Sequence, residues 1–209
     1  MKMKKINILL AVLALGFIST NSFANHLQPS KRELVPGGDL YHINLSGAKL
    51  NGIRLEGADL YDSDLSGAKL RGAKMDGVDL TNSNLSGADL RSITLNGTEL
   101  SNTNLSGANL FSAKMNGAIA EDANMRNVKL NSATLRGAKL SRVDLTGANL
   151  NNTDLTGADL SESMLNGANL TGASLSNSRL DGISATNLKG CPNSLPPGWI
   201  CEKNSLIKI

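Results

Sequence analysis

A leucine at every fifth position constrains the fold of this chain more than any other feature. The register runs without a slip from Leu40 to Leu180, and neither the Leu position nor the position two residues before it carries a charge. Four residues replace Leu in this array: Met75, Met115, Ala120 and Met125. A period of five is neither the roughly 3.6 residues of an α-helix nor the roughly 2 residues of a plain strand. Two inward positions with an outward residue between them predict one very short extended side in each pentad.

The two remaining positions of each pentad have the composition of a turn. Two residues after Leu the chain most often has Gly, as at Gly47 and Gly57, and elsewhere commonly Asn, Asp or Ser, as at Asp62 and Asn82. These residues favour tight turns. All five prolines lie outside the array, as expected where backbone N–H groups pair between neighbouring segments. Each pentad therefore predicts one short side and one corner of a coil.

A second, longer period indicates how many sides make up one coil. The tetrapeptide Leu-Ser-Gly-Ala begins at Leu45 and recurs at Leu65, Leu85 and Leu105, in steps of 20 residues. Four pentads therefore complete one square coil, and equivalent residues stack ~4.8 Å apart, the spacing of hydrogen-bonded strands. The array predicts about seven coils and a rod roughly 34 Å long.

The segments that begin at Ala58, Ala88, Ala108, Ala148 and Ala158 share the pattern Ala-Asp/Asn-Leu. In this pattern the chain resembles the pentapeptide repeat family, over nearly the whole length that follows the N-terminal segment. The resemblance implies an all-β fold, a right-handed quadrilateral β-helix, in agreement with the four-sided coil. It implies little about function, because most members of the family have no assigned activity.

The first residues have the pattern of a secretory signal peptide. Three lysines precede an apolar run over residues 6–18, and Ser22-Phe23-Ala24 is a small-x-small cleavage site, so we expect cleavage after Ala24 and a periplasmic or secreted product. The alternative is an uncleaved membrane anchor, although the run is short for a span of ~20 residues. Three of the 21 basic residues lie in the segment, so its removal leaves 18 basic and 18 acidic residues. This balance points neither to a nucleic-acid partner nor to an anionic membrane surface, and we expect no stable membrane insertion after cleavage.

The domain boundaries follow from the array. We expect a signal peptide over residues 1–24, an N-terminal cap or tail over 25–38, the β-helix over 39–185, and a C-terminal cap over 186–209.

The expected C-terminal cap contains the only two cysteines of the chain, Cys191 and Cys201. Export would place them in an oxidising compartment, so we predict a disulfide. A zinc site would need closer spacing and more ligands. Trp199 and its apolar neighbours are expected to cover the open end of the solenoid. The alternative for Trp199 is a binding hot spot.

Reading every twentieth residue maps the outer surface. One edge, the acidic edge, has no Lys or Arg before residue 125 and collects Asp59, Asp62, Asp64, Asp79, Glu99, Glu121 and Asp122. The opposite edge, the basic edge, collects Lys49, Arg54, Lys69, Arg71, Lys74, Arg91 and Lys114. The acidic edge is either an ordinary solvated surface with pairs between coils or a site for a basic partner or divalent cations. Tyr41 and Tyr61, which are 20 residues apart, should share a face and could grip a sugar or a peptide.

A filled interior leaves no concave site for chemistry. We therefore expect no catalytic, cofactor-binding or metal-binding residues, and predict a non-enzymatic structural or protein-interaction module whose partner the sequence does not identify. The alternative is a mimic of duplex DNA that protects gyrase, as the best-known members of the resembled family do; the signal peptide and the neutral charge disfavour it. Ala120 places a small side chain at a core position that is Leu or Met in the other pentads. This predicts either a local soft spot or repacking by Ile119.

Overall fold

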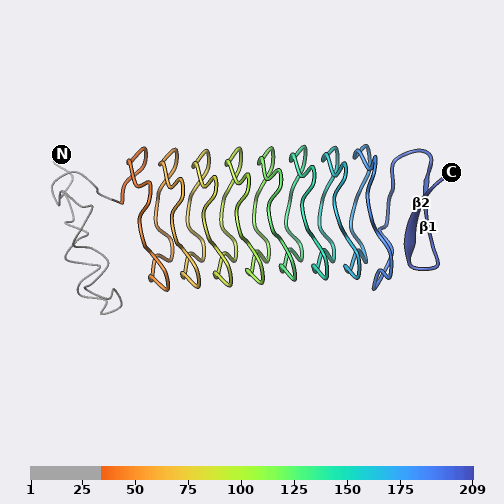
Figure 1. Cartoon of the computed structure of the whole chain (residues 1–209), viewed down its shortest axis with the longest axis horizontal. Helices are drawn as coiled ribbons and strands as arrows, with labels where there is room; N and C mark the ends of the chain where they lie inside the picture. The colour runs from red at the N-terminus through yellow and green to blue at the C-terminus, as the bar shows by residue number, and fades with distance from the viewer. Residues whose placement is uncertain (1–33) are drawn as a thin grey trace.

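The structure, a computed structural model, describes residues 34–209. The expected signal peptide and most of the expected N-terminal tail lie outside the described residues. The described chain winds into a rod of stacked coils, and a short hairpin follows the last coil at the C-terminal end (Figure 1). Within this part of the chain, no helix has the length and apolar character needed to cross a membrane.

Parallel pairing between neighbouring coils holds the rod together. The outward residue before each Leu position pairs with the residue 20 positions later, as Asp59 does with Asp79 and Asn84 with Asn104. For example, the Leu40 N–H donates to the Asp59 carbonyl at 2.7 Å, and the Asp59 N–H donates to the Gly38 carbonyl at 2.9 Å. One coil therefore takes 20 residues and has four sides. The fold is the right-handed quadrilateral β-helix that the sequence predicts.

A tight turn forms each corner of the coil. At one corner, the Ala48 N–H donates back to the Leu45 carbonyl at 3.0 Å. The second turn residue has a positive φ, 65° at Gly47 and 60° at Asn82, as a type II turn requires. This backbone requirement explains why Gly and Asn recur two residues after Leu.

The interior is a continuous apolar column. Leu60, Leu80 and Leu100, on successive coils, are completely buried. Ser or Thr sometimes takes the smaller inward position, and its hydroxyl then finds a backbone acceptor: Ser83 Oγ donates to the Leu60 carbonyl at 2.7 Å. Because such buried hydroxyls are hydrogen-bonded, they avoid the penalty of an unsatisfied polar group.

Ile119 does not replace the large core side chain that is missing at Ala120. Ala120 is fully buried, but Ile119 is only partly buried and occupies the outward bridge position between Glu99 and Lys139. The expected repacking by Ile119 is therefore wrong, because the pentad register points the residue before the Leu position away from the core. A local soft spot at Ala120 stays a prediction.

The C-terminal hairpin consists of β1 (Trp199–Glu202) and β2 (Ser205–Lys208), which pair antiparallel. Lys203 and Asn204 connect them with φ values of 47° and 58°, as in the two-residue type I′ turns that suit hairpins. The predicted disulfide between Cys191 and Cys201 is present, with Cα atoms 5.9 Å apart. Trp199 is partly buried against the core, the position that the capping interpretation expects.

Candidate functional site

The coil geometry places four carboxylates in a single row on the acidic edge. Asp39 pairs with Asp59, Asp59 with Asp79, and Asp79 with Glu99 in successive parallel bridges. At ~4.8 Å between coils the row is about 14 Å long. We call Asp39, Asp59, Asp79 and Glu99 the acidic ladder. Sequence analysis missed Asp39 because it precedes the first Leu of the array, although its place 20 residues before Asp59 is a signal that could have found it.

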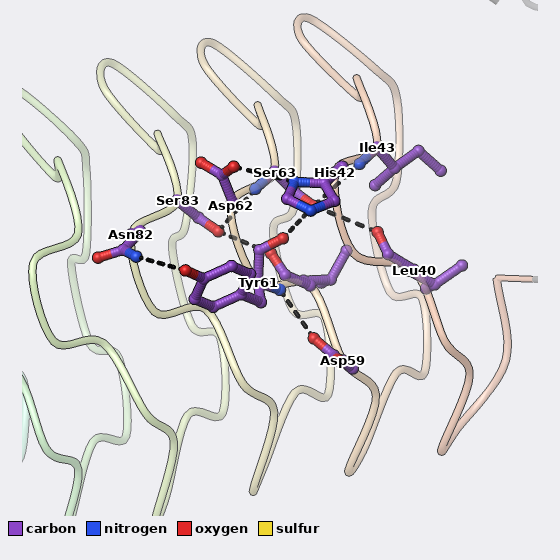
Figure 2. Close-up of polar contacts among 10 residues, drawn as sticks. Leu40, His42, Ile43, Asp59, Tyr61, Asp62, Ser63, Asn82 and Ser83 are labelled. Atoms are coloured by element: carbon purple, nitrogen blue, oxygen red, sulfur yellow. Dashed lines mark hydrogen bonds and ion pairs between the residues drawn. The ribbon is translucent and has the colours of Figure 1, made fainter. Parts of the chain in front are cut away.

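The backbone orients two carboxylates of the acidic ladder. Asp59 Oδ1 accepts a hydrogen bond from the Tyr61 N–H at 2.9 Å (Figure 2), and Asp79 Oδ1 accepts one from the Thr81 N–H at 2.9 Å. In both residues the other carboxylate oxygen has no hydrogen-bond partner within residues 34–209. None of the four carboxylates forms an ion pair with a described residue. Within the described chain the acidic ladder is therefore a row of negative charge without a cationic partner.

The two predicted tyrosines lie at the corner beside the acidic ladder. Tyr41 and Tyr61 are both exposed, at 41% and 39%. The ring of His42 contacts both tyrosines edge-on, with centroid distances of 5.5 Å to Tyr41 and 6.0 Å to Tyr61. The structure thus brings both tyrosines together at one corner through His42, which sequence analysis did not single out. Tyr61 is held further by Asn82, whose amide donates to the phenol oxygen at 3.0 Å (Figure 2).

The other two predicted acidic residues of this region have local partners. Asp62 Oδ2 lies 2.9 Å from His42 Nδ1, with both side chains more than half exposed. Asp64 faces the next side of the coil, where its Oδ1 accepts hydrogen bonds from the Ser66 N–H at 2.9 Å and the Asn84 amide at 3.3 Å. The predicted surface residues therefore divide between the acidic ladder, the corner of Tyr41 and Tyr61, and the side that carries Asp64.

The predicted acidic edge is shorter in the structure than in the sequence map. Arg142 binds both members of its C-terminal part, at 2.8 Å from Asp122 and 3.4 Å from Glu121. The Arg142 guanidinium lowers the pKa of Asp122 below its ordinary value, and this carboxylate in turn raises the pKa of Arg142. The uncompensated part of the edge ends at Glu99.

Other arginines of the C-terminal half also pair with acidic residues of neighbouring coils. Arg126 contacts Asp144 at 2.8 Å, and further pairs join Arg136 to Asp154 and Arg179 to Asp159. Partial burial by itself would raise the pKa of Asp144, but hydrogen bonds from Thr146 and Arg126 outweigh it and lower the pKa. Here the structure matches the ordinary solvated surface that sequence analysis kept as the alternative.

The basic edge keeps a cationic surplus on the opposite corner of the coil. Lys49 pairs with Lys69 and Arg54 with Lys74 across neighbouring coils, so like charges stack. Two arginines are neutralised locally: Arg54 by Glu56 at 2.9 Å, and Arg91 by Asp89 at 2.6 Å. The hydrogen bond from Arg91 lowers the pKa of Asp89 although partial burial opposes it. The N-terminal half is therefore charged with opposite signs on two opposite corners.

Two features of the acidic edge concern the kind of ligand that it could bind. Within residues 34–209, no group of three or more His, Cys, Asp or Glu residues is placed to hold a metal ion. The geometry therefore gives no support to the expectation of divalent cations at the acidic edge. The acidic ladder combines one exposed carboxylate, Asp39, with three partly exposed ones, Asp59, Asp79 and Glu99. Such a row is complementary to Lys and Arg side chains of another macromolecule.

Comparison with known proteins identifies the class to which this coil belongs. The sequence matches pentapeptide repeats, in 8 copies, over residues 39–77, 73–110, 108–147 and 144–182. These segments cover more than half of the chain, so the protein belongs to the pentapeptide repeat family. No curated protein matches the chain.

Several solved structures are similar to this chain. HetL of the cyanobacterium Nostoc sp. strain PCC 7120, a pentapeptide repeat protein involved in heterocyst differentiation regulation, is 25% identical over 88% of this chain and 93% of its own, with a TM-score of 0.34. A pentapeptide repeat protein of the Arabidopsis thaliana thylakoid lumen is 31% identical over 51% of this chain and 71% of its own, with a TM-score of 0.39. QnrB1, a plasmid-mediated fluoroquinolone resistance protein, is 19% identical over 77% of this chain and 92% of its own, with a TM-score of 0.45. At these TM-scores the likenesses assign no function to the chain.

Proposed function

We propose that this protein is an exported, non-enzymatic interaction module whose acidic ladder binds a basic protein partner. The observation that carries the proposal is the contrast between the two halves of the rod. The acidic ladder has no cation among the described residues, whereas acidic residues of the C-terminal half, such as Asp122, Asp144 and Asp159, each contact an Arg. Uncompensated charge of one sign steers an oppositely charged partner and fixes its register.

The spacing of the acidic ladder suggests the shape of the partner. Its four carboxylates span three coil steps, about 14 Å, and ten residues of α-helix span about 15 Å. Basic residues at positions i, i+3, i+7 and i+10 of a helix share one face and would lie opposite the four carboxylates. Tyr41 and Tyr61 border one end of the row and offer aromatic faces to a Lys or Arg side chain, an interaction that contributes ~0.5–1 kcal/mol at exposed sites.

Export is supported by the pattern of residues 1–24 and by the disulfide. Lysines, an apolar run and a small-x-small site follow one another in the order of a signal peptide. Disulfides persist mainly in oxidising compartments, and the Cys191–Cys201 bridge suits the periplasm or the medium. We therefore place the partner in one of these two compartments.

Mimicry of duplex DNA receives less support. A duplex carries about one negative charge per 1.7 Å of its axis, whereas the acidic ladder supplies one carboxylate per coil, or about one per 4.8 Å. Beyond Glu99 the same column continues with Ile119 and then Lys139. The row is therefore too sparse and too short to imitate a phosphate backbone.

Crosslinking in the native cell tests the proposed function. In a ladder variant, Asp59→Asn, Asp79→Asn and Glu99→Gln remove three charges and keep an oxygen acceptor at each position. A control variant, with Glu162→Gln, Asp181→Asn and Glu202→Gln, removes the same charge from exposed residues elsewhere, of which Asp181 contacts Lys208 at 3.1 Å. We expect one basic protein of the envelope or the medium to crosslink to the wild type and the control variant but not to the ladder variant. Equal crosslinking of both variants would contradict the proposal.

A further inference from the structure

The hairpin ends the rod with a strand edge that has no partner in the described chain. The Leu206 N–H of β2 donates to the Ala185 carbonyl of the preceding coil at 3.0 Å, so the backbone of Leu206 faces the coil and not β1. Leu206 lies opposite Cys201, and Lys208 lies opposite Trp199. Because hydrogen-bonded and non-hydrogen-bonded pairs alternate along an antiparallel ladder, the backbone groups of Cys201 and Trp199 point away from β2. Neither residue has a backbone hydrogen bond to any residue from 34 to 209.

The two faces of the hairpin also differ, because one packs against the rod and the other is exposed. Side chains on one face, those of Trp199, Cys201 and Leu206, pack against the core of the rod. On the other face Ile200 lies directly opposite Ile207, which is 40% exposed. The outer strand therefore combines unpaired backbone groups with an apolar side chain beside its free edge. Such an edge is a template for another strand.

We propose that two copies of this chain join end to end by antiparallel pairing of β1 with β1 of the second copy, about a twofold axis at Ile200. In this register Trp199 of each copy lies opposite Cys201 of the other, so all the unpaired N–H and C=O groups of both residues find partners. The two Ile200 side chains meet at the axis and extend the Ile207–Ile200 row across a four-stranded sheet. This proposal does not depend on the acidic ladder.

The register follows from the residues around the strand. An axis at Trp199 would place Pro197, which lacks an N–H, opposite Cys201. An axis at Cys201 would place Trp199 opposite Lys203, which has a φ of 47° and lies in the turn. Only the axis at Ile200 places both Trp199 and Cys201 opposite residues of a strand. It also places Glu202 opposite Gly198, so the Glu202 side chains of the two copies do not face each other. The edge is therefore self-complementary, which favours a second copy over an unrelated strand.

Analytical ultracentrifugation of the purified full chain tests this proposal, with two charged variants at the axis. We expect a dimer for the wild type. Ile200→Lys and Ile200→Glu should each raise the dimer dissociation constant at least ~10-fold, because like charges then lie directly opposite each other. Mixing the two variants should restore the dimer, because opposite charges meet at the same position. The matched control is Ile209→Lys, which changes an Ile that is 78% exposed just beyond the end of β2 and that pairs with Gly198, not with Ile200.

Three results would overturn the proposal. The first is a wild type that stays monomeric at every soluble concentration, which would leave the edge free or reserved for an unrelated strand. The second is equal loss of the dimer in Ile209→Lys and Ile200→Lys, which would indicate unspecific apolar contact. The third is failure of the mixed variants to associate while each keeps the circular dichroism spectrum and the disulfide of the wild type.

Discussion

At the scale of single residues, the pentad separates positions that the fold requires from positions that are free to vary. The Leu position and the position two before it are inward, and the turn requires a positive φ two residues after Leu. The outward residue before Leu is restricted only through its backbone. This division explains why Asp59, Asn84 and Lys69 occupy equivalent sites in the same rod. The outward residues are therefore the positions at which members of this fold can differ without loss of the coil.

Gly107 offers a direct test of the turn requirement. Its φ is 66°, and nothing lies within 4 Å of a Cβ placed there, so a substitution meets no obstacle except the backbone conformation. Gly107→Ala should lower the free energy of unfolding by about 1–2 kcal/mol, whereas Gly107→Asn should cost less because Asn tolerates the left-handed region. Denaturant unfolding of the two variants checks this. Equal destabilisation by both would show that the loss does not come from φ.

At the scale of elements, the C-terminal hairpin and the disulfide form one unit that closes the rod. Their existence could be predicted in part: the cysteine spacing and the apolar residues indicated a stapled cap. The hairpin itself was not predicted. Its strands are only four residues long, and the turn between them uses Lys203 and Asn204 in place of the Gly-containing pairs that usually mark such turns.

Replacing both Cys191 and Cys201 by Ser should lower the stability of the C-terminal cap more than that of the coils. A bridge across a separation of 10 residues stabilises by roughly 2–3 kcal/mol in the chain-entropy model. In a solenoid, stability is approximately a sum over neighbouring units. Hydrogen exchange should therefore accelerate in residues 186–209 of the variant and stay slow in the central coils. Acceleration of equal size along the whole rod would show that the cap and the coils unfold as one unit.

The ion pairs between coils predict that the stability of the fold depends on pH. Arg142 lowers the pKa of Asp122 in the folded chain, so the pair stabilises the fold fully above the unfolded value of about 3.8 and loses this effect as pH falls through the lower folded value. The melting temperature of Arg142→Gln should therefore lie slightly below that of the wild type near neutral pH, as expected for an exposed pair. The difference should vanish in acid below the folded pKa. A difference that persisted there would indicate that Arg142 acts through packing instead.

At the scale of the whole molecule, the periodicity of the sequence predicted most of the fold and little of the site. The five-residue and 20-residue periods predicted the coil, its four sides and its core, because backbone pairing repeats with the sequence. The same map found Asp59, Asp79 and Glu99 on one edge. It did not find that Arg142 neutralises Asp122 or that His42 joins Tyr41 to Tyr61, because these contacts depend on side-chain conformations that periodicity does not specify.

The charges are distributed unevenly along the rod. In its C-terminal half several acidic residues pair with arginines. Its N-terminal half keeps the acidic edge around one corner and the basic edge around the opposite corner. Lateral encounters between copies are therefore possible at low salt, but exposed ion pairs are individually weak and are screened at physiological ionic strength. A specific partner must match several carboxylates at once.

Titration of the purified protein with a defined basic helix tests the central claim most directly. The probe is a helical peptide with Lys at positions i, i+3, i+7 and i+10, and its matched control carries Gln at those positions. We predict that the Lys peptide binds the wild type and the control variant equally, and that added salt weakens this binding. The ladder variant should bind at least ~10-fold more weakly, a loss of about 1.4 kcal/mol. Binding of the Lys peptide with equal affinity to the ladder variant and the control variant would contradict the account.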